Sequence, residues 1–158
     1  MTWIFSQRSR DNLAGVHPDL VKVVERALEL SPVDFAVTEG LRTEDRQREL
    51  VAVGASRTMT SRHLTGHAVD LAPVVGGRIR WDWPLFYPLA KAMQQAAEEL
   101  GVRVTWGGVW DRDLTVLGDP KNAMIAYQGR ERARNREPFC DGPHFQLDWY
   151  AYPVPEVA

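Results

Sequence analysis

Apolar residues recur at helical spacing in two parts of the chain. Between residues 18 and 28 they follow one another at three- and four-residue intervals, which predicts an amphipathic helix that begins at Pro18. A longer helix is expected over residues 84–100, and a third, mostly polar helix over residues 43–54, capped by Thr43. The inner positions of the two apolar stripes are Leu20, Val23, Val24, Ala27 and Leu28, then Leu85, Leu89, Met93, Ala96 and Leu100.

Other segments have the pattern of strands. Residues 33–37 alternate between apolar and other residues, which is typical of a strand buried on one face. Residues 143–147 predict a final core strand, with His144 and Gln146 on one face and Phe145 and Leu147 on the other. Residues 68–73 are apolar except for Asp70, so they predict a buried strand with one carboxylate, and a further strand begins at Val102. Helices interspersed with a few short strands predict an α+β fold.

Composition limits the classes of protein that the chain can belong to. At 158 residues and 44% hydrophobic content it is expected to form one domain over residues 1–158. A formal net charge of −2 argues against nucleic acid and anionic membranes as partners. The single cysteine, Cys140, excludes an internal disulfide and a thiolate metal site.

Targeting signals and membrane segments are not expected. No apolar run approaches the roughly 20 residues that cross a bilayer, and the amino-terminal residues do not have the pattern of a signal peptide. Folding in the cytoplasm is therefore the expectation. Residues 111–140 are polar, broken by Gly and Pro, and end in a basic run, which predicts an insertion that leaves the core for the solvent.

The densest chemical signal lies between residues 61 and 70. His63 and Asp70 flank Gly66, whose backbone freedom allows the two side chains to meet. Imidazole and carboxylate are good zinc ligands, and His144 is the best candidate for a third. Such a set leaves one zinc position open for water, and Asp141 could take a proton from that water during hydrolysis of a peptide bond.

Arg42 is the candidate for stabilising the negative charge that develops during such a reaction. It lies just beyond the expected strand at residues 33–37. A surface or ion-pairing role is equally compatible with its neighbours, Arg46 and Arg48.

Several other residues have competing interpretations. His67 lies four residues after His63, but the segment lacks the glutamate of a His-Glu-x-x-His helix, so a structural role is preferred. Cys140 permits a thiol-peptidase hypothesis, which would leave the segment around His63 unexplained. Trp106 and Trp110 could line a substrate cleft or anchor the core.

These residues resemble a known family. Residues 61–70 fit Ser-x-His-x-x-Gly-x-Ala-x-Asp and residues 141–144 fit Asp-x-x-His, the pattern of LAS-type (peptidase M15) metallopeptidases, which include D-Ala-D-Ala carboxypeptidases. The phage endolysins of the L-alanyl-D-glutamate peptidase type are more similar still. The segments that carry this closer resemblance are residues 38–43, 61–71, 106–108 and 143–145.

The resemblance implies a fold and a site. It implies a small antiparallel sheet packed with helices, as in the hedgehog and D,D-peptidase folds. It also implies one Zn²⁺ per chain at His63, Asp70 and His144, with Asp141 as the catalytic base. The implied function is a bacteriolytic endopeptidase that hydrolyses the L-Ala-D-Glu bond of the peptidoglycan stem peptide. A D-Ala-D-Ala carboxypeptidase and a non-catalytic zinc-bearing wall-binding module are the alternatives.

The resemblance has further implications and one departure. A phage endolysin would be a monomer that stays in the host cytoplasm until a holin releases it to the periplasm and cell wall. A separate cell-wall-binding domain is not expected within residues 1–158. Family members commonly place Trp-Gly-Gly close to Asp-x-x-His, whereas residues 111–140 intervene here. A solvated surface insertion is preferred over a cover for the cleft and over contact of its arginines with anionic wall polymers.

Overall fold

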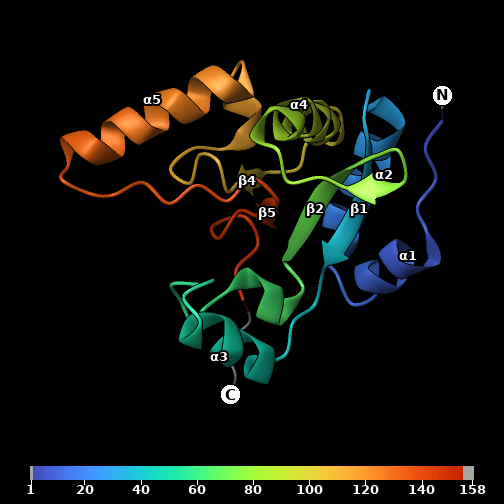
Figure 1. The fold of residues 1–158 in the computed structure, drawn as a ribbon, viewed down its shortest axis with the longest axis horizontal. Coiled ribbons are helices and arrows are strands. Elements are labelled where there is room, and N and C mark those ends of the chain that lie inside the picture. Colours follow the sequence, from blue (N-terminus) through green and yellow to red (C-terminus); the bar gives the residue numbers. More distant parts are fainter. Residues whose placement is uncertain (1, 155–158) are drawn as a thin grey trace.

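The computed structural model describes residues 2–154, which form an antiparallel sheet covered by helices (Figure 1). The strands lie in the order β1-β2-β5-β4, and β3 pairs with the far end of β2. This architecture confirms the predicted α+β class. The helices are α1 (Gln7–Leu13), α2 (Pro18–Leu30), α3 (Glu44–Ala52), α4 (Trp83–Leu100) and α5 (Pro120–Ala133); the strands are β1 (Asp34–Glu39), β2 (Ala68–Val75), β3 (Arg78–Ile79), β4 (Val104–Trp106) and β5 (His144–Leu147); the 3-10 turns are η1 (Arg62–Thr65) and η2 (Leu114–Val116).

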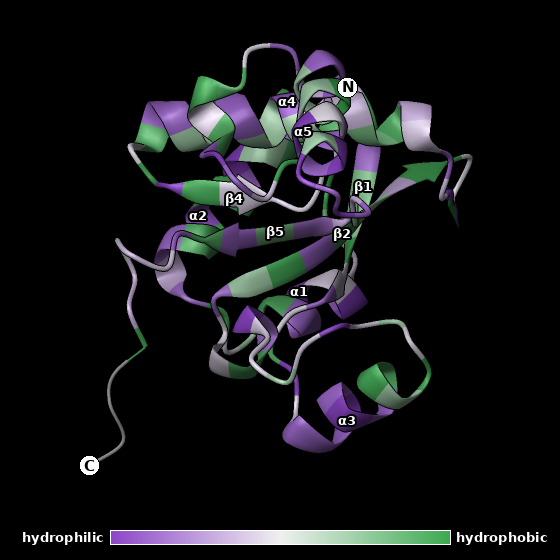
Figure 2. Cartoon of the chain, turned by 90° about the vertical axis from the view of Figure 1, so that its left-hand side faces the viewer, coloured by the Kyte–Doolittle hydropathy of each residue, from purple (hydrophilic) through white to green (hydrophobic). Residues whose placement is uncertain are grey.

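Helix ends lie where the sequence predicts them. The Thr43 side chain accepts a hydrogen bond from the backbone N–H of Arg46 and caps α3. Gly101 ends α4 in the left-handed conformation, with φ of +67°. His17 caps α2 by accepting from the Asp19 N–H. In Figure 2, α3 is largely hydrophilic, as its sequence predicts.

One face of the sheet forms the core together with α2 and α4. Alternate residues of the two central strands, Val69 and Leu71 in β2 and Phe145 and Leu147 in β5, are fully buried in that core. The residues between them therefore point to the opposite face of the sheet. The predicted inner stripe of α4 is wrong at its end, because Leu100 is 45% exposed beside the Gly101 cap.

Helix α1 has no counterpart among the predicted elements. Its sequence has too few apolar residues for a stripe, and its role is polar. The Ser9 hydroxyl accepts from the Val37 N–H at 3.1 Å, and the Asn12 side chain donates to the Val37 carbonyl at 2.8 Å. Helix α1 thus covers the outer edge of β1, which would otherwise expose unpaired backbone groups.

Residues 111–140 do not form the purely solvated insertion that the sequence predicts. They contain η2 and α5, and three of their side chains are buried in the core: Leu114, Met124 and Tyr127. The buried Gln94 of α4 also donates to the Leu114 carbonyl at 3.0 Å. The apolar residues of this segment are confined to two short groups, residues 114–117 and 123–127, which form no stripe along the whole helix but suffice to dock α5 on the core (Figure 1).

The guanidinium of Arg62 fastens the segment that follows β5. Arg62 is 1% exposed, and its Nη2 donates to the backbone carbonyls of Leu147, Asp148 and Tyr152 at 3.1, 3.2 and 2.6 Å. The guanidinium also lies 4.1 Å from the centre of the Trp149 ring. One side chain therefore connects η1 to the carboxyl-terminal part of the described chain.

Replacement of Arg62 by methionine is expected to lower the free energy of unfolding by about 2 kcal/mol. Hydrogen bonds from charged groups contribute about 1.5–3 kcal/mol to stability. Part of that loss is offset, because methionine also removes Nε and Nη1, two buried donors that have no hydrogen-bond partner within residues 2–154. Urea unfolding measures the change. The exposed Arg8→Met is the control and should shift stability by less than about 0.5 kcal/mol. Equal stability of Arg62→Met and wild type would contradict the fastening role.

Candidate active site

Strand register brings three ionisable residues into one row. Asp70 is the register partner of Glu39 on β1 and of His144 on β5. Directly opposed residues in an antiparallel sheet point to the same face, so their side chains share the face away from the core. An irregularity in β1 between Val37 and Glu39 sets this alignment.

His63 joins the row from outside the sheet. It lies in η1, which ends at Gly66 in the left-handed conformation with φ of +74°. A side chain at Gly66 would also collide with the backbone carbonyl of Gly15, so both backbone angle and space require glycine there. The turn after His63 thus returns the chain into β2 and brings His63 against Asp70, as the sequence predicts.

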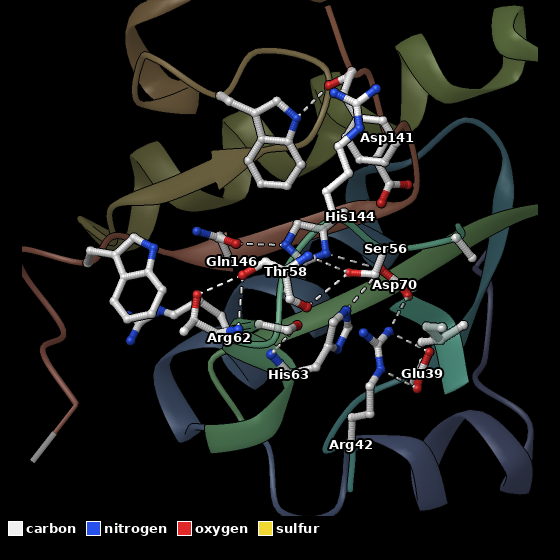
Figure 3. A pocket seen from close by; sticks show the side chains of 18 residues that line it. Glu39, Arg42, Ser56, Thr58, Arg62, His63, Asp70, Asp141, His144 and Gln146 are labelled. Carbon is white, nitrogen blue, oxygen red and sulfur yellow. Dashed lines mark hydrogen bonds and ion pairs between the residues drawn. The ribbon is translucent and has the colours of Figure 1, made fainter. Parts of the chain in front are cut away.

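The two histidines approach the same carboxylate oxygen. His63 Nε2 lies 3.2 Å and His144 Nδ1 lies 3.3 Å from Oδ1 of Asp70 (Figure 3). In each ring, the nitrogen that does not face Asp70 has a hydrogen-bond partner that holds a proton on that nitrogen. His63 Nδ1 donates to the Gly40 carbonyl at 2.8 Å, and His144 Nε2 donates to Oε1 of Gln146 at 2.7 Å. Because those oxygens only accept, each ring in its neutral form presents a lone pair to Asp70. In the metal-free site, burial lowers the pKa of His144, but a proton shared with Asp70 outweighs burial and raises that pKa.

This arrangement fits a metal ion. Two imidazole lone pairs and an anionic oxygen that face one another repel unless a positive charge, either a proton or a metal ion, lies among them. One ligand atom from each of His63, Asp70 and His144 lies within 4.8 Å of the others, and the two histidines are buried. These three residues could therefore hold a metal ion, with hydrogen bonds already in place to orient both rings.

Two carboxyl groups of the site have opposite pKa shifts. At Asp70, burial raises the pKa, but the imidazoles of His63 and His144 outweigh burial and hold it well below its ordinary value. At Asp141, burial raises the pKa and the negative charge of Asp70 raises it further. Asp70 is thus a permanent anion suited to bind a cation, whereas Asp141 is the more basic carboxylate, suited to proton transfer.

Arg42 is held in a network that sequence reasoning found only in part. Its guanidinium donates twice to Glu39, both times at 2.7 Å, and once to Gln47 at 2.7 Å, and Nη2 lies 3.5 Å from Oδ2 of Asp70. Glu39 and the fully buried Gln47 were not predicted as site residues. Glu39 lies three residues before Arg42, but a single glutamate or glutamine in a sequence does not indicate a functional site. The register of β1 places Glu39 opposite Asp70, and Arg42 then joins both residues to Gln47.

A cleft of about 400 Å³ opens over these residues. Its walls include Trp110, whose ring centre lies 5.1 Å from that of His144, and Asp141. Trp106 is instead fully buried and donates from Nε1 to the Gly142 carbonyl at 2.8 Å. The two tryptophans thus divide the roles that the sequence left open: Trp110 lines the cleft and Trp106 anchors the core.

Comparison with known proteins places the chain in a family. A family model described as phage L-alanyl-D-glutamate peptidase matches residues 1–147. The chain belongs to this family. Membership confirms the resemblance that the two sequence motifs indicate, and the chain is a peptidase of the phage endolysin type.

Individual members of the phage L-alanyl-D-glutamate peptidase family agree with this placement. The chain is 41% identical to the L-alanyl-D-glutamate peptidase of Escherichia phage T5 over 115 residues, which are 70% of this chain and 84% of that protein. It is 31% identical to the enzyme of the same name from Listeria phage A118, over 96% of this chain and 45% of that longer protein. The crystal structure of the Serratia marcescens L-Ala D-Glu endopeptidase ChiX superposes with a TM-score of 0.73 at 43% identity, covering 96% of this chain and 95% of that one.

Two residues with competing interpretations lie away from the His-Asp-His cluster of this family member. Cys140 packs against the core, and burial raises the pKa of its thiol, which disfavours the thiolate that a thiol peptidase needs. His67 contacts the Thr65 hydroxyl at 2.7 Å, and its ring lies beside that of His17. Neither residue contributes to the cluster.

No helix between residues 2 and 154 has the length and apolar character that crossing a membrane requires.

Proposed function

We propose that the chain is a zinc-dependent endopeptidase that hydrolyses the L-Ala-D-Glu bond of the peptidoglycan stem peptide. The observation that carries the proposal is the convergence of His63 Nε2, His144 Nδ1 and Asp70 Oδ1 at the floor of an open cleft. Two imidazoles and one carboxylate form a donor set that suits zinc, and catalytic zinc sites keep a position open. The names of the related enzymes support the choice of bond.

Asp141 is the proposed catalytic base. Its carboxyl lines the same cleft as the three ligands, and its raised pKa makes it a better proton acceptor than Asp70. When bound, zinc supplies a Lewis acid that lowers the pKa of water and polarises the scissile carbonyl. Asp141 accepts the proton of the attacking water and passes it to the leaving amine of D-Glu.

Arg42 has two proposed tasks. Its contact with Oδ2 of Asp70 fixes the orientation of that carboxylate, because Glu39 and Gln47 hold the guanidinium on its other sides. These contacts use four of the five N–H groups of the guanidinium. The fifth, on Nη1, remains for the oxygen that becomes negative in the tetrahedral intermediate.

The biological setting follows from the proposed reaction. The partner is the stem peptide of the wall, and we propose that residues 1–158 act as one monomeric catalytic domain. As for an endolysin, we propose that the enzyme stays in the host cytoplasm until a holin opens the membrane, and then acts in the periplasm and wall.

Product analysis tests the proposed reaction directly. Purified disaccharide pentapeptide is incubated with the enzyme, and mass spectrometry identifies the new ends. We expect a disaccharide that retains only L-Ala and a released peptide that begins with D-Glu. Release of free D-Ala without a new L-Ala carboxyl end would identify a carboxypeptidase instead. Binding of the fragment without any product would identify a wall-binding module.

A further inference from the structure

Arg57 differs from the other cationic side chains of the cleft. Among the described residues, the cleft is lined by three arginines and no lysine: Arg42, Arg57 and Arg62. Arg42 is bound to Glu39, Gln47 and Asp70, and Arg62 is buried on three backbone carbonyls. Arg57 is exposed and has neither an ion pair nor a hydrogen bond within residues 2–154. Its donors are therefore available to a molecule in the cleft.

Contacts hold the Arg57 guanidinium at a defined wall of the cleft. Its central carbon lies 4.6 Å from the centre of the Phe139 ring. The Phe139 backbone is itself fixed, because its carbonyl accepts a hydrogen bond from Trp110 Nε1 at 2.8 Å. The Trp110 ring in turn packs on His144. A continuous series of contacts thus links Arg57 to a proposed metal ligand.

The acidic side chains that the structure describes in the cleft do not pair with Arg57. Glu39 pairs with Arg42, and Asp70 faces the two histidines. Asp141 lines the same cleft but forms neither an ion pair nor a hydrogen bond with Arg57 within residues 2–154. No described acidic side chain of the cleft therefore pairs with Arg57, and its positive charge favours a ligand that carries an anionic group.

We propose that Arg57 is a specificity-determining residue that binds the free carboxylate of the D-glutamate residue on the leaving-group side of the scissile bond. This inference rests on the proposed function. A glutamate residue has two carboxyl groups, and whichever of them continues the peptide, the other stays free and anionic. It lies on the residue that follows the cleaved bond, within reach of the cleft that holds the metal ligands. Arginine suits this task because its planar fork binds a carboxylate through two hydrogen bonds.

A matched pair of substrates isolates the contribution of that carboxylate. The first is an N-acylated L-Ala-γ-D-Glu-L-Lys-D-Ala peptide, and the second carries D-isoglutamine in place of D-Glu, so that a neutral amide replaces the free carboxylate. Steady-state kinetics on both peptides are measured for wild type, Arg57→Gln, Arg57→Lys and Arg48→Gln. Arg48 lies on α3 outside the cleft lining and pairs with acidic residues of its own helix, so its variant controls for loss of one positive charge.

We expect wild type and Arg48→Gln to prefer the carboxylate peptide in kcat/KM by about 10-fold to 100-fold, the range of a charge-assisted hydrogen bond. Arg57→Gln should lose that preference through a higher KM for the carboxylate peptide, with its kinetics on the amide peptide unchanged. Arg57→Lys should retain part of the preference, because it keeps the charge without the fork.

Two results would overturn the inference while leaving the proposed function intact. One is a wild type that cleaves both peptides equally well. The other is an Arg57→Gln variant that loses the same factor on both peptides, which would assign Arg57 a structural role on Phe139. Failure of wild type to cleave either peptide, in a preparation that still lyses cell walls, would overturn the proposed bond and this inference with it.

Discussion

Replacement of His63 by alanine is expected to abolish both stoichiometric metal binding and wall lysis. His63 offers one of the three proposed ligand atoms and is 1% exposed, so its removal leaves a donor set of two residues, Asp70 and His144. Even residues that only hydrogen-bond to a ligand contribute about 10- to 100-fold to metal affinity, and loss of a ligand itself should exceed the upper figure. Metal content after gel filtration and lysis of isolated walls measure the two effects on one sample.

His67 provides a matched control from the same motif. It lies four residues away, contacts Thr65 and His17, and does not belong to the His-Asp-His cluster. His67→Ala should therefore bind metal and lyse walls within a few-fold of wild type. Circular dichroism verifies that both variants are folded. A folded His63→Ala variant that retains one metal ion per chain would remove this residue from the proposed ligand set.

Replacement of Asp141 by asparagine should separate catalysis from metal binding. Asparagine keeps the shape of the side chain, and the backbone bonds of residue 141 to Gly107 and His144 are unaffected. It cannot accept the proton of the attacking water. We expect kcat to fall by about 100- to 10,000-fold, the usual contribution of general acid-base catalysis, with metal content unchanged.

Asp148→Asn is the corresponding control, because Asp148 lies just beyond β5 and is not part of the cleft lining. Its kcat should equal that of wild type. If Asp141→Asn also lost the metal, Asp141 would act in binding rather than in proton transfer. If Asp141→Asn kept full kcat, another group would have to be the base.

Patterns that repeat along the chain predicted most of the fold. The apolar stripe of α2 follows from burial on one side of the helix, and the alternation in β5 follows from the apolar core face and the polar site face of a strand whose four residues are all buried. Helix α1 and the docking of α5 could not be predicted in this way. Ser9 and Asn12 act through hydrogen bonds to a strand about 25 residues away, and Leu114 and Tyr127 belong to two short apolar groups, residues 114–117 and 123–127, that do not continue as a stripe along a helix.

The site shows the same division. His63, Asp70 and His144 could be predicted because their residue types and spacing are typical of a metal site, and the structure brings them together. Glu39 and Gln47 escaped notice because their importance depends on strand register and on the position of the Arg42 guanidinium. Neither feature is visible before the chain is folded.

The most direct test of the central claim is metal dependence measured on a single preparation. Zinc content and wall-lysing activity are determined together on purified protein, after chelation, and after stepwise return of zinc. We predict one zinc per chain, with activity that disappears on chelation and returns in proportion to bound zinc. Lysis that continues unchanged in zinc-free protein would contradict the mechanism built on His63, Asp70 and His144.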